Sequence, residues 1–180
     1  MNTDLFNWKD KVHLESGKLA IRNATPKDSE VLCSWWNDGA IMAHAGFPNG
    51  IGTSAEEIVE TIKQDNDLNR RLILEFESVA IGEMSYRATE ERTAEIGIKI
   101  CDANVQNKGY GTTLIKMLIN YLFNHLGYEK IVLDTNLKNK RAQHVYEKLG
   151  FKRTATRMNS WKNQLGEVQS TVEYELSKED

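Results

Sequence analysis

The chain has 180 residues, of which 40% are hydrophobic and 27% are charged, and its formal net charge is −3. This length and composition indicate a globular protein with a substantial buried core, and the acidic balance argues against a nucleic-acid-binding surface. The two cysteines, Cys33 and Cys101, have no metal-type spacing, which argues against a disulfide scaffold and against a metal site.

The N-terminal segment shows no targeting pattern. Residues 1–6 lack the basic and apolar regions of a signal peptide. No apolar run along the chain approaches the ~20 residues that span a bilayer. We therefore expect a cytoplasmic protein without a nucleic-acid or membrane partner. We expect its single domain to fill residues 1–180, with a core at about residues 19–176 and an N-terminal extension at residues 1–18.

The first third of the chain predicts a strand and two helices. Residues 19–24 read as the strand. Thr25 and Pro26 then favour the start of a helix, with threonine as the N-cap and proline at the first helical position. After a glycine-rich loop, Ser54 and Glu57 have the spacing of a capping box, so a second helix begins there.

The remaining elements alternate between strand and helix patterns. In order, they are strands at residues 71–76, 79–87 and 93–100, a helix at 110–126, a strand at 130–135, a helix at 139–150, and strands at 151–156 and 168–176. An antiparallel run followed by a right-handed crossover to a parallel strand accounts for this order. We expect an α/β fold of mixed α+β type, with a mostly antiparallel six- to seven-stranded sheet flanked by helices on both faces.

A glycine-containing loop joins the strand at 93–100 to the helix at 110–126. It carries Gln106, Gly109 and Gly111. Glycines let the backbone approach an anion, and the first turn of a helix offers free N–H groups and a positive dipole end. The loop is then a plain connection, a dinucleotide-binding loop for which Asp134 would be the ribose-binding acid, or a coenzyme A pyrophosphate loop. Leu114 occupies the place of the third glycine of the dinucleotide motif, which counts against the second alternative.

Two motifs together resemble a known family. Gln106-x-x-Gly109-x-Gly111 resembles the first signature of the GNAT acetyltransferases, and Asn139-x-x-Ala142 with Tyr146 and Leu149-Gly150-Phe151 resembles their second signature. The chain is most similar to the branch with ribosomal-protein alanine, spermidine and aminoglycoside N-acetyltransferases. It departs from the family at Asn107, where glycine is usual, and at Ser170, where many members have aspartate.

The resemblance implies that acetyl-CoA binds along a strand that splays from its neighbour after Gly97. A glycine inside a strand pattern is itself a bulge signal. A freed backbone N–H there would stabilise the developing oxyanion. The residues implied in binding acetyl-CoA are Ile98, Lys99, Ile100, Gln106, Asn107, Lys108, Gly109, Tyr110, Gly111, Thr112, Asn136, Asn139 and Tyr146.

The resemblance also assigns roles to side chains. Tyr146 would be the general acid for the CoA thiolate, although it could equally be a packed core tyrosine, and Asn139 is also a good N-cap. Because the attacking amine must be neutral, a carboxylate should take its proton. Glu95 is the first candidate for this base and Glu83 the second, and either could instead be a surface or ion-paired glutamate. Lys138, Lys140 and Arg141 form either a phosphate contact or a solvated helix face.

Trp35, Trp36, Asn37 and Asp38 are expected to border the acceptor pocket, together with the glycine-rich loop after Ala45. A helix-core position is the alternative for the tryptophans. The resemblance thus implies direct transfer from acetyl-CoA to a primary amine, with no acyl-Cys101 intermediate and no metal. The amine could be a protein N-terminus or a small cation. A CoA-binding sensor or scaffold without turnover is the alternative. The sequence leaves the oligomeric state open, with a homodimer as one alternative.

Overall fold

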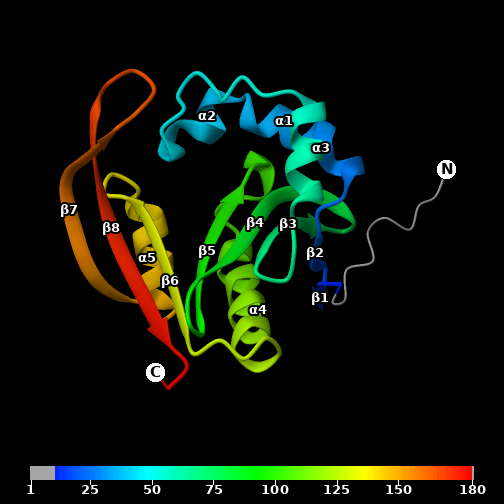
Figure 1. Ribbon diagram of the computed structural model, residues 1–180, viewed down its shortest axis with the longest axis vertical. Helices are drawn as coiled ribbons and strands as arrows, with labels where there is room; N and C mark the ends of the chain where they lie inside the picture. The colour runs from blue at the N-terminus through cyan, green and yellow to red at the C-terminus, as the bar shows by residue number, and fades with distance from the viewer. Residues whose placement is uncertain (1–10, 180) are drawn as a thin grey trace.

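The computed structural model describes residues 11–179, within which eight strands form one sheet with five α-helices around it (Figure 1). The strand order is β1-β2-β3-β4-β5-β6-β8-β7. The strands are β1 (His13–Ser16), β2 (Leu19–Asn23), β3 (Asn69–Phe76), β4 (Val79–Glu90), β5 (Thr93–Ile100), β6 (Lys130–Asn136), β7 (Lys152–Lys162) and β8 (Val168–Ser177). The helices are α1 (Ser29–Trp36), α2 (Gly39–Met42), α3 (Ala55–Lys63), α4 (Tyr110–Asn124) and α5 (Lys140–Lys148), with 3-10 turns η1 (Pro26–Asp28), η2 (Ala43–Ala45) and η3 (Ala103–Val105).

The fold class expected from the sequence is confirmed. All neighbouring strands are antiparallel except β5 and β6, which run parallel across the crossover helix α4. The expected number of strands was too low, because β1 pairs with β2 from His13 opposite Arg22 to Ser16 opposite Leu19. Residues 13–16 of the expected extension therefore belong to the sheet. Residues 1–10 lie outside the described part of the chain, and the division into one domain stays a prediction.

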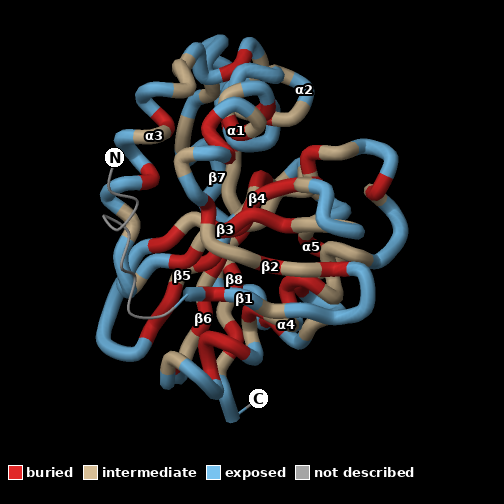
Figure 2. The backbone as a smooth tube through the Cα atoms, turned by 90° about the vertical axis from the view of Figure 1, so that its right-hand side faces the viewer, coloured by how far each residue is buried: buried red, intermediate tan, exposed pale blue. Residues whose placement is uncertain are grey.

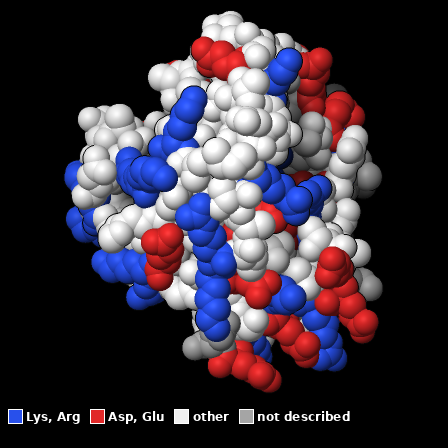
Figure 3. All heavy atoms as spheres, turned by 90° about the vertical axis from the view of Figure 1, so that its left-hand side faces the viewer, with Lys and Arg blue, Asp and Glu red and all other residues white. Residues whose placement is uncertain are grey.

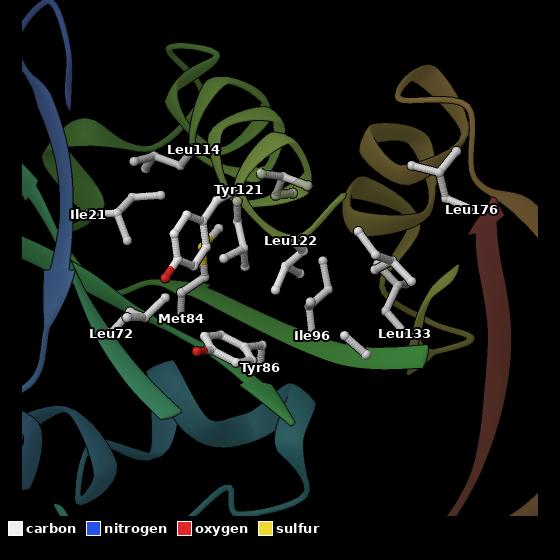
Figure 4. Packing of buried hydrophobic residues seen from close by; sticks show 14 of the residues in the cluster. Ile21, Leu72, Met84, Tyr86, Ile96, Leu114, Tyr121, Leu122, Leu133 and Leu176 are labelled. Carbon is white, nitrogen blue, oxygen red and sulfur yellow. The ribbon is translucent and has the colours of Figure 1, made fainter. Parts of the chain in front are cut away.

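A hydrophobic core lies on each face of the sheet. On one face, the apolar side of α4 packs against the central strands, as Figure 4 shows for Leu114 and Leu122 above Met84 and Ile96. On the other face, α1 and α3 pack around Ile73. Buried segments are concentrated in the central strands, whereas the loops are exposed (Figure 2). Helices on both faces were expected, and these two cores hold the sheet between them.

Two local features of the N-terminal helices follow from their capping residues. The capping box of α3 is confirmed, because the Glu57 N–H donates to Ser54 Oγ over 3.2 Å and the Ser54 N–H donates to Glu57 Oε2 over 2.9 Å. The sequence did not predict α2. Its N-cap is Asp38, whose Oδ1 accepts from the Ala40 N–H over 2.8 Å. This short helix carries the chain over the sheet edge where the cleft described below opens.

The strands β5 and β6 separate soon after they begin. Their parallel pairing covers only three residue pairs, from Thr93 opposite Lys130 to Glu95 opposite Val132. Beyond this point β6 continues alongside β8 as far as Asn136, and β5 stays with β4. The expected splay is therefore present. The expected bulge at Gly97 is not, because β4 and β5 keep an unbroken register there, with Gly97 opposite Ser85.

The surface carries both charges. On the face with β7 and β8, Lys and Arg side chains are interspersed with Asp and Glu (Figure 3), in keeping with the formal net charge of −3. None of the helices in residues 11–179 has the length and apolar character that a membrane crossing requires.

Candidate functional site

A cleft of about 930 Å³ occupies the gap between the separated strands. Its floor and walls come from β5, β6, α5 and the start of α4, and its rim comes from α2, η2 and β7. The expected site residues that line it are Ile98, Lys99, Ile100, Gln106, Gly111, Asn136, Asn139 and Tyr146. Residues far apart in the sequence are thus brought together around one opening.

The β5 wall presents backbone groups to the cleft. The Cys101 N–H donates to the Ile81 carbonyl at 2.8 Å, so it points toward β4. Because backbone groups alternate sides along a strand, those of Ile98 and Ile100 point the opposite way, into the cleft. Gln106 Nε2 donates to the Ile100 carbonyl at 2.9 Å, which agrees with this direction. No β6 partner remains beyond Glu95, and the N–H groups of these two isoleucines face the open gap.

The loop before α4 has the geometry of an anion site. Gly109 is the N-cap of α4 with φ +79°, and an added Cβ would have no atom within 4 Å, so its surroundings are open. Asn107 has φ +61°, a left-handed conformation that asparagine tolerates better than most residues. This explains how an asparagine can stand where the resembled family has glycine. Tyr110, Gly111 and Thr112 form the first turn of α4, where N–H groups lack helical partners.

Side chains of α5 and the loop meet at the mouth of this site. Arg141 Nη1 donates to Gln106 Oε1 at 3.0 Å and places a positive charge beside the α4 N-terminus. Asn139 Oδ1 accepts from the Ala142 N–H over 3.2 Å, so its expected role as the N-cap of α5 is confirmed. Lys108 and Tyr110, both expected to bind acetyl-CoA, lie outside the cleft lining. Lys108 is exposed, and Tyr110 stacks on Phe76 with ring centroids 5.0 Å apart.

Tyr146 lies on α5 at the bottom of the cleft and is 7% exposed. Its ring packs edge-on against Phe151 and Tyr174, with centroids 6.0 Å and 5.8 Å away. Burial, followed by the nearby charge of Asp134, raises the pKa of Tyr146 to about 12. The phenol therefore keeps its proton at neutral pH. Tyr146 is a packed tyrosine that also lines the cleft, and its role as a general acid stays a prediction.

Asp134 was missed as a catalytic candidate. It lies on β6 where the strands part, and its side chain is exposed to the cleft and to a smaller adjoining hollow of about 490 Å³. Burial by the surrounding walls, followed by the charges of Glu95 and Glu173, raises the pKa of Asp134, and Arg87 opposes this only in part. The sequence placed an acid at the end of this strand, but only as a ribose ligand. Its position opposite the β5 wall depends on the splay.

The two glutamates expected as bases have other partners. Glu95 is paired with Arg87 at 2.9 Å and lines only the smaller hollow. Glu83 is 7% exposed and accepts from Trp36 Nε1 at 2.8 Å, with Arg71 Nη1 at 2.7 Å and Lys99 Nζ at 3.2 Å. Burial acts to raise the pKa of Glu83. The charges of Lys99 and Arg71 and the hydrogen bonds from Trp36 and Arg71 outweigh it, so the pKa is lowered.

The residues expected at the acceptor pocket support its wall from behind. Trp35 is buried in the core under α1, and the Trp36 ring lies under the Arg71 guanidinium with the two 4.4 Å apart. Asn37 Oδ1 accepts from the Gly52 and Thr53 N–H groups over 2.8 and 2.9 Å. None of the three lines the cleft. Asp38, which was also expected at this pocket, does line the cleft, together with Ala40, Ile41, His44 and Ala45.

The Cys101 thiol and the question of a metal site also bear on the chemistry. Burial, followed by the charge of Glu83, raises the pKa of Cys101 to about 12, so this thiol stays protonated and is a poor nucleophile. Among residues 11–179, no group of three or more His, Cys, Asp or Glu side chains is placed to hold a metal ion.

Comparison with known proteins decides the family. Residues 18–152 match the model of the acetyltransferase (GNAT) domain. The chain belongs to the GNAT acetyltransferase family. The resemblance based on the two motifs is therefore confirmed, and the chain is an N-acetyltransferase that uses acetyl-CoA and acetylates an amine.

Relatives and solved structures of GNAT proteins agree with this. The chain is 28% identical over 159 residues to the uncharacterized N-acetyltransferase YnaD of Bacillus subtilis (strain 168), covering 83% of this chain and 92% of that protein. It is 27% identical over 143 residues to the spermidine N(1)-acetyltransferase of Vibrio cholerae, covering 77% and 75%. The crystal structure of spermidine N-acetyltransferase from Vibrio cholerae with CoA and spermine superposes with a TM-score of 0.81 at 24% identity, covering 91% of this chain and 98% of that one. At this identity the structure shows the shared fold.

Proposed function

We propose that acetyl transfer takes place in the cleft between β5 and β6, directly from acetyl-CoA to the amine. The observation that carries the proposal is the parting of these strands after Glu95. It leaves the backbone groups of Ile98 and Ile100 facing a cleft that has the α4 N-terminus at one end and Tyr146 at the other.

The two substrates would enter the cleft from opposite faces of the sheet. The α4 N-terminus, with the open Gly109 amide and Arg141 nearby, suits the pyrophosphate of coenzyme A, because helix N-termini and exposed N–H groups bind anions. The acceptor then enters from the opposite face, past α2, η2 and β7. The thioester would lie between them, with its carbonyl against the freed N–H groups of the β5 wall.

The proton transfers are assigned to Asp134 and Tyr146. An alkyl amine has a pKa of about 10, so only about one molecule in a thousand is neutral at pH 7. Asp134 takes the proton that the amine loses as its nitrogen bonds to the thioester carbon. When the C–S bond breaks, Tyr146 gives its proton to the departing thiolate. Asp134 suits the base role better than Glu83, because the pKa of Asp134 is raised and that of Glu83 is lowered.

The acceptor is a cationic amine. The smaller hollow joins the cleft at Asp134 and Trp161 and also contains Glu95 and Glu173. Glu95 and Glu173 are paired with Arg87 and Arg157, so Asp134 and the Trp161 ring are the groups that would attract an ammonium group there. The Vibrio cholerae relative is named for spermidine, which is an amine of this type.

Calorimetry with acetyl-CoA tests where the coenzyme binds. Gly111→Glu adds a carboxylate to the first turn of α4 at a site with ordinary backbone geometry, where an added Cβ meets no atom closer than 4.0 Å. Repulsion of the pyrophosphate should weaken binding by about fivefold or more. Asn120→Glu adds the same charge to an exposed position about 13 Å along the helix and should leave the affinity unchanged. Equal affinities of the two variants would contradict this placement.

Turnover separates the enzyme from the sensor. Purified protein with acetyl-CoA and a panel of amines should release CoA and give acetylated amine. A protein that binds acetyl-CoA tightly and turns over no amine would be the CoA-binding sensor or scaffold instead. The cytoplasmic location and the homodimer remain proposals, which cell fractionation and light scattering of the purified chain test.

A further inference from the structure

The outer side of the cleft is closed by a bridge between two distant segments. The loop at residues 46–50 follows η2, and the turn at residues 163–167 joins β7 to β8. Gln164 connects them. Its backbone N–H donates to the Gly46 carbonyl at 2.8 Å, its side-chain Oε1 accepts from the Asn49 N–H over 2.9 Å, and its Nε2 donates to the Gly50 carbonyl at 2.9 Å.

A close aromatic contact lies beside this bridge. A Cβ added to Gly46 would lie 2.6 Å from the Trp161 ring, and Gly46 has φ +97°, so only glycine lets the ring rest on the backbone there. Trp161 lines both the main cleft and the smaller hollow, and its neighbours across the contact, His44 and Ala45, also line the cleft. The bridge therefore stands at the rim of the acceptor opening.

The bridge adds to the hydrogen bond from Arg141 to Gln106, which already joins the two sides of the cleft beside the α4 N-terminus. β5 and β6 are paired over only three residue pairs at one end of the cleft. At the far side, the Gln164 hydrogen bonds and the Trp161 contact join η2 to β7. These contacts hold the loop at residues 46–50 against the turn at residues 163–167 and against Trp161, so they limit how far this part of the rim can open.

We propose that Gln164 is a specificity-determining residue, which keeps the acceptor opening narrow and thereby selects slender, unbranched amines over amines that carry sugar rings. This inference rests on the proposed function, because it concerns the amine that reaches Asp134. Gln164 acts through the rim and does not line the cleft itself, so its effect falls on the choice of acceptor and not on acetyl-CoA.

The test compares kcat/KM for spermidine, a linear amine, with kcat/KM for kanamycin, a ring-bearing amine. The wild type should favour spermidine. Gln164→Ala should lower the spermidine-to-kanamycin ratio by about tenfold, a factor within the range that pocket shape alone provides. The KM for acetyl-CoA should stay unchanged. Gln164→Glu keeps the oxygen that accepts from Asn49 and loses the donor to Gly50. Its spermidine-to-kanamycin ratio should therefore lie between those of the wild type and Gln164→Ala.

Leu165→Ala is the matched control, since Leu165 is the next residue of the same turn and is 56% exposed. Its ratio should equal that of the wild type. An unchanged ratio in folded Gln164→Ala would overturn the proposal, and so would a wild type that prefers kanamycin. Hydrogen exchange at the Asn49 amide reports the bridge itself. Wild-type protein that protects this amide and acetylates neither amine nor any other in the panel would overturn the proposed function, and the acceptor role of Gln164 with it.

Discussion

The two walls of the cleft expose different parts of the chain. The β5 wall offers backbone groups of Ile98 and Ile100, on a strand fixed by β4 and by the core under α4. The β6 wall offers side chains, namely Asp134 on the strand and Asn139 and Tyr146 on α5. Substitutions near the first wall should therefore act mainly on stability, and substitutions on the second should act mainly on rate.

The largest effect on stability is expected from Glu83→Ala. This substitution leaves Lys99 and Arg71 without their buried partner and should cost about 3–5 kcal/mol of unfolding free energy, measured by urea denaturation. Because the folded pKa of Glu83 is lowered, its contribution is complete at neutral pH and is lost as the pH falls below the ordinary glutamate value of about 4.3.

Arg87→Ala is the matched control for Glu83. It breaks the exposed pair with Glu95, and such pairs contribute about 1 kcal/mol or less. Glu83→Gln addresses the base role directly. Full stability together with a hundredfold loss of kcat would assign the base to Glu83. It would also contradict the expectation that substitutions near the β5 wall act mainly on stability.

Tyr146→Phe should have the largest effect on rate. The ring keeps its contacts with Phe151 and Tyr174, so stability should change little, while loss of the proton donor should lower kcat by about 10²–10⁴-fold. Steady-state kinetics with acetyl-CoA and a reactive amine measure this. Tyr128→Phe removes a hydroxyl from a buried tyrosine outside the cleft and should retain kcat. Equal rates for wild type and Tyr146→Phe would leave Tyr146 as a packing residue.

Asp134→Asn should lower the rate less than Tyr146→Phe does, and it should raise the stability of the folded protein. At pH 7, kcat/KM should fall by about 10–100-fold, and the deficit should shrink as rising pH deprotonates the amine without help. The raised pKa means that the folded state holds this proton to a higher pH than the unfolded state does. Ionised Asp134 therefore costs folding free energy at neutral pH, and the asparagine variant should melt at a slightly higher temperature. Lower stability together with full activity would assign Asp134 a structural role.

The smallest effect is expected from Asn107→Gly. Glycine adopts φ +61° without strain but makes the unfolded chain more flexible, so stability should change by about 1 kcal/mol or less. Acetyl-CoA affinity by calorimetry should stay within about twofold, because only a backbone amide is presented there. A large loss of affinity would show that the Asn107 side chain itself binds the coenzyme.

The features that the sequence predicted depend on neighbours along the chain. The capping box of Ser54 and Glu57, the cap of Asn139 and the helix α4 each follow from residues within a few turns. The features that it missed depend on distant pairings. Asp134 becomes a candidate only because β5 leaves β6, and Gln164 meets Asn49 across 115 residues. β1 was missed because its strand pattern is only four residues long and three of those residues are exposed.

The open backbone of β5 also has an evolutionary consequence. An N–H group belongs to every residue except proline, so almost any substitution at Ile98 or Ile100 preserves the donor. Under the proposed function, selection can therefore replace the side chains of the opposite wall and of the rim around Trp161 while the backbone donors persist unaltered. A lineage built on this cleft can drift far in sequence and acquire new amines as substrates without having to reinvent the step that breaks the thioester.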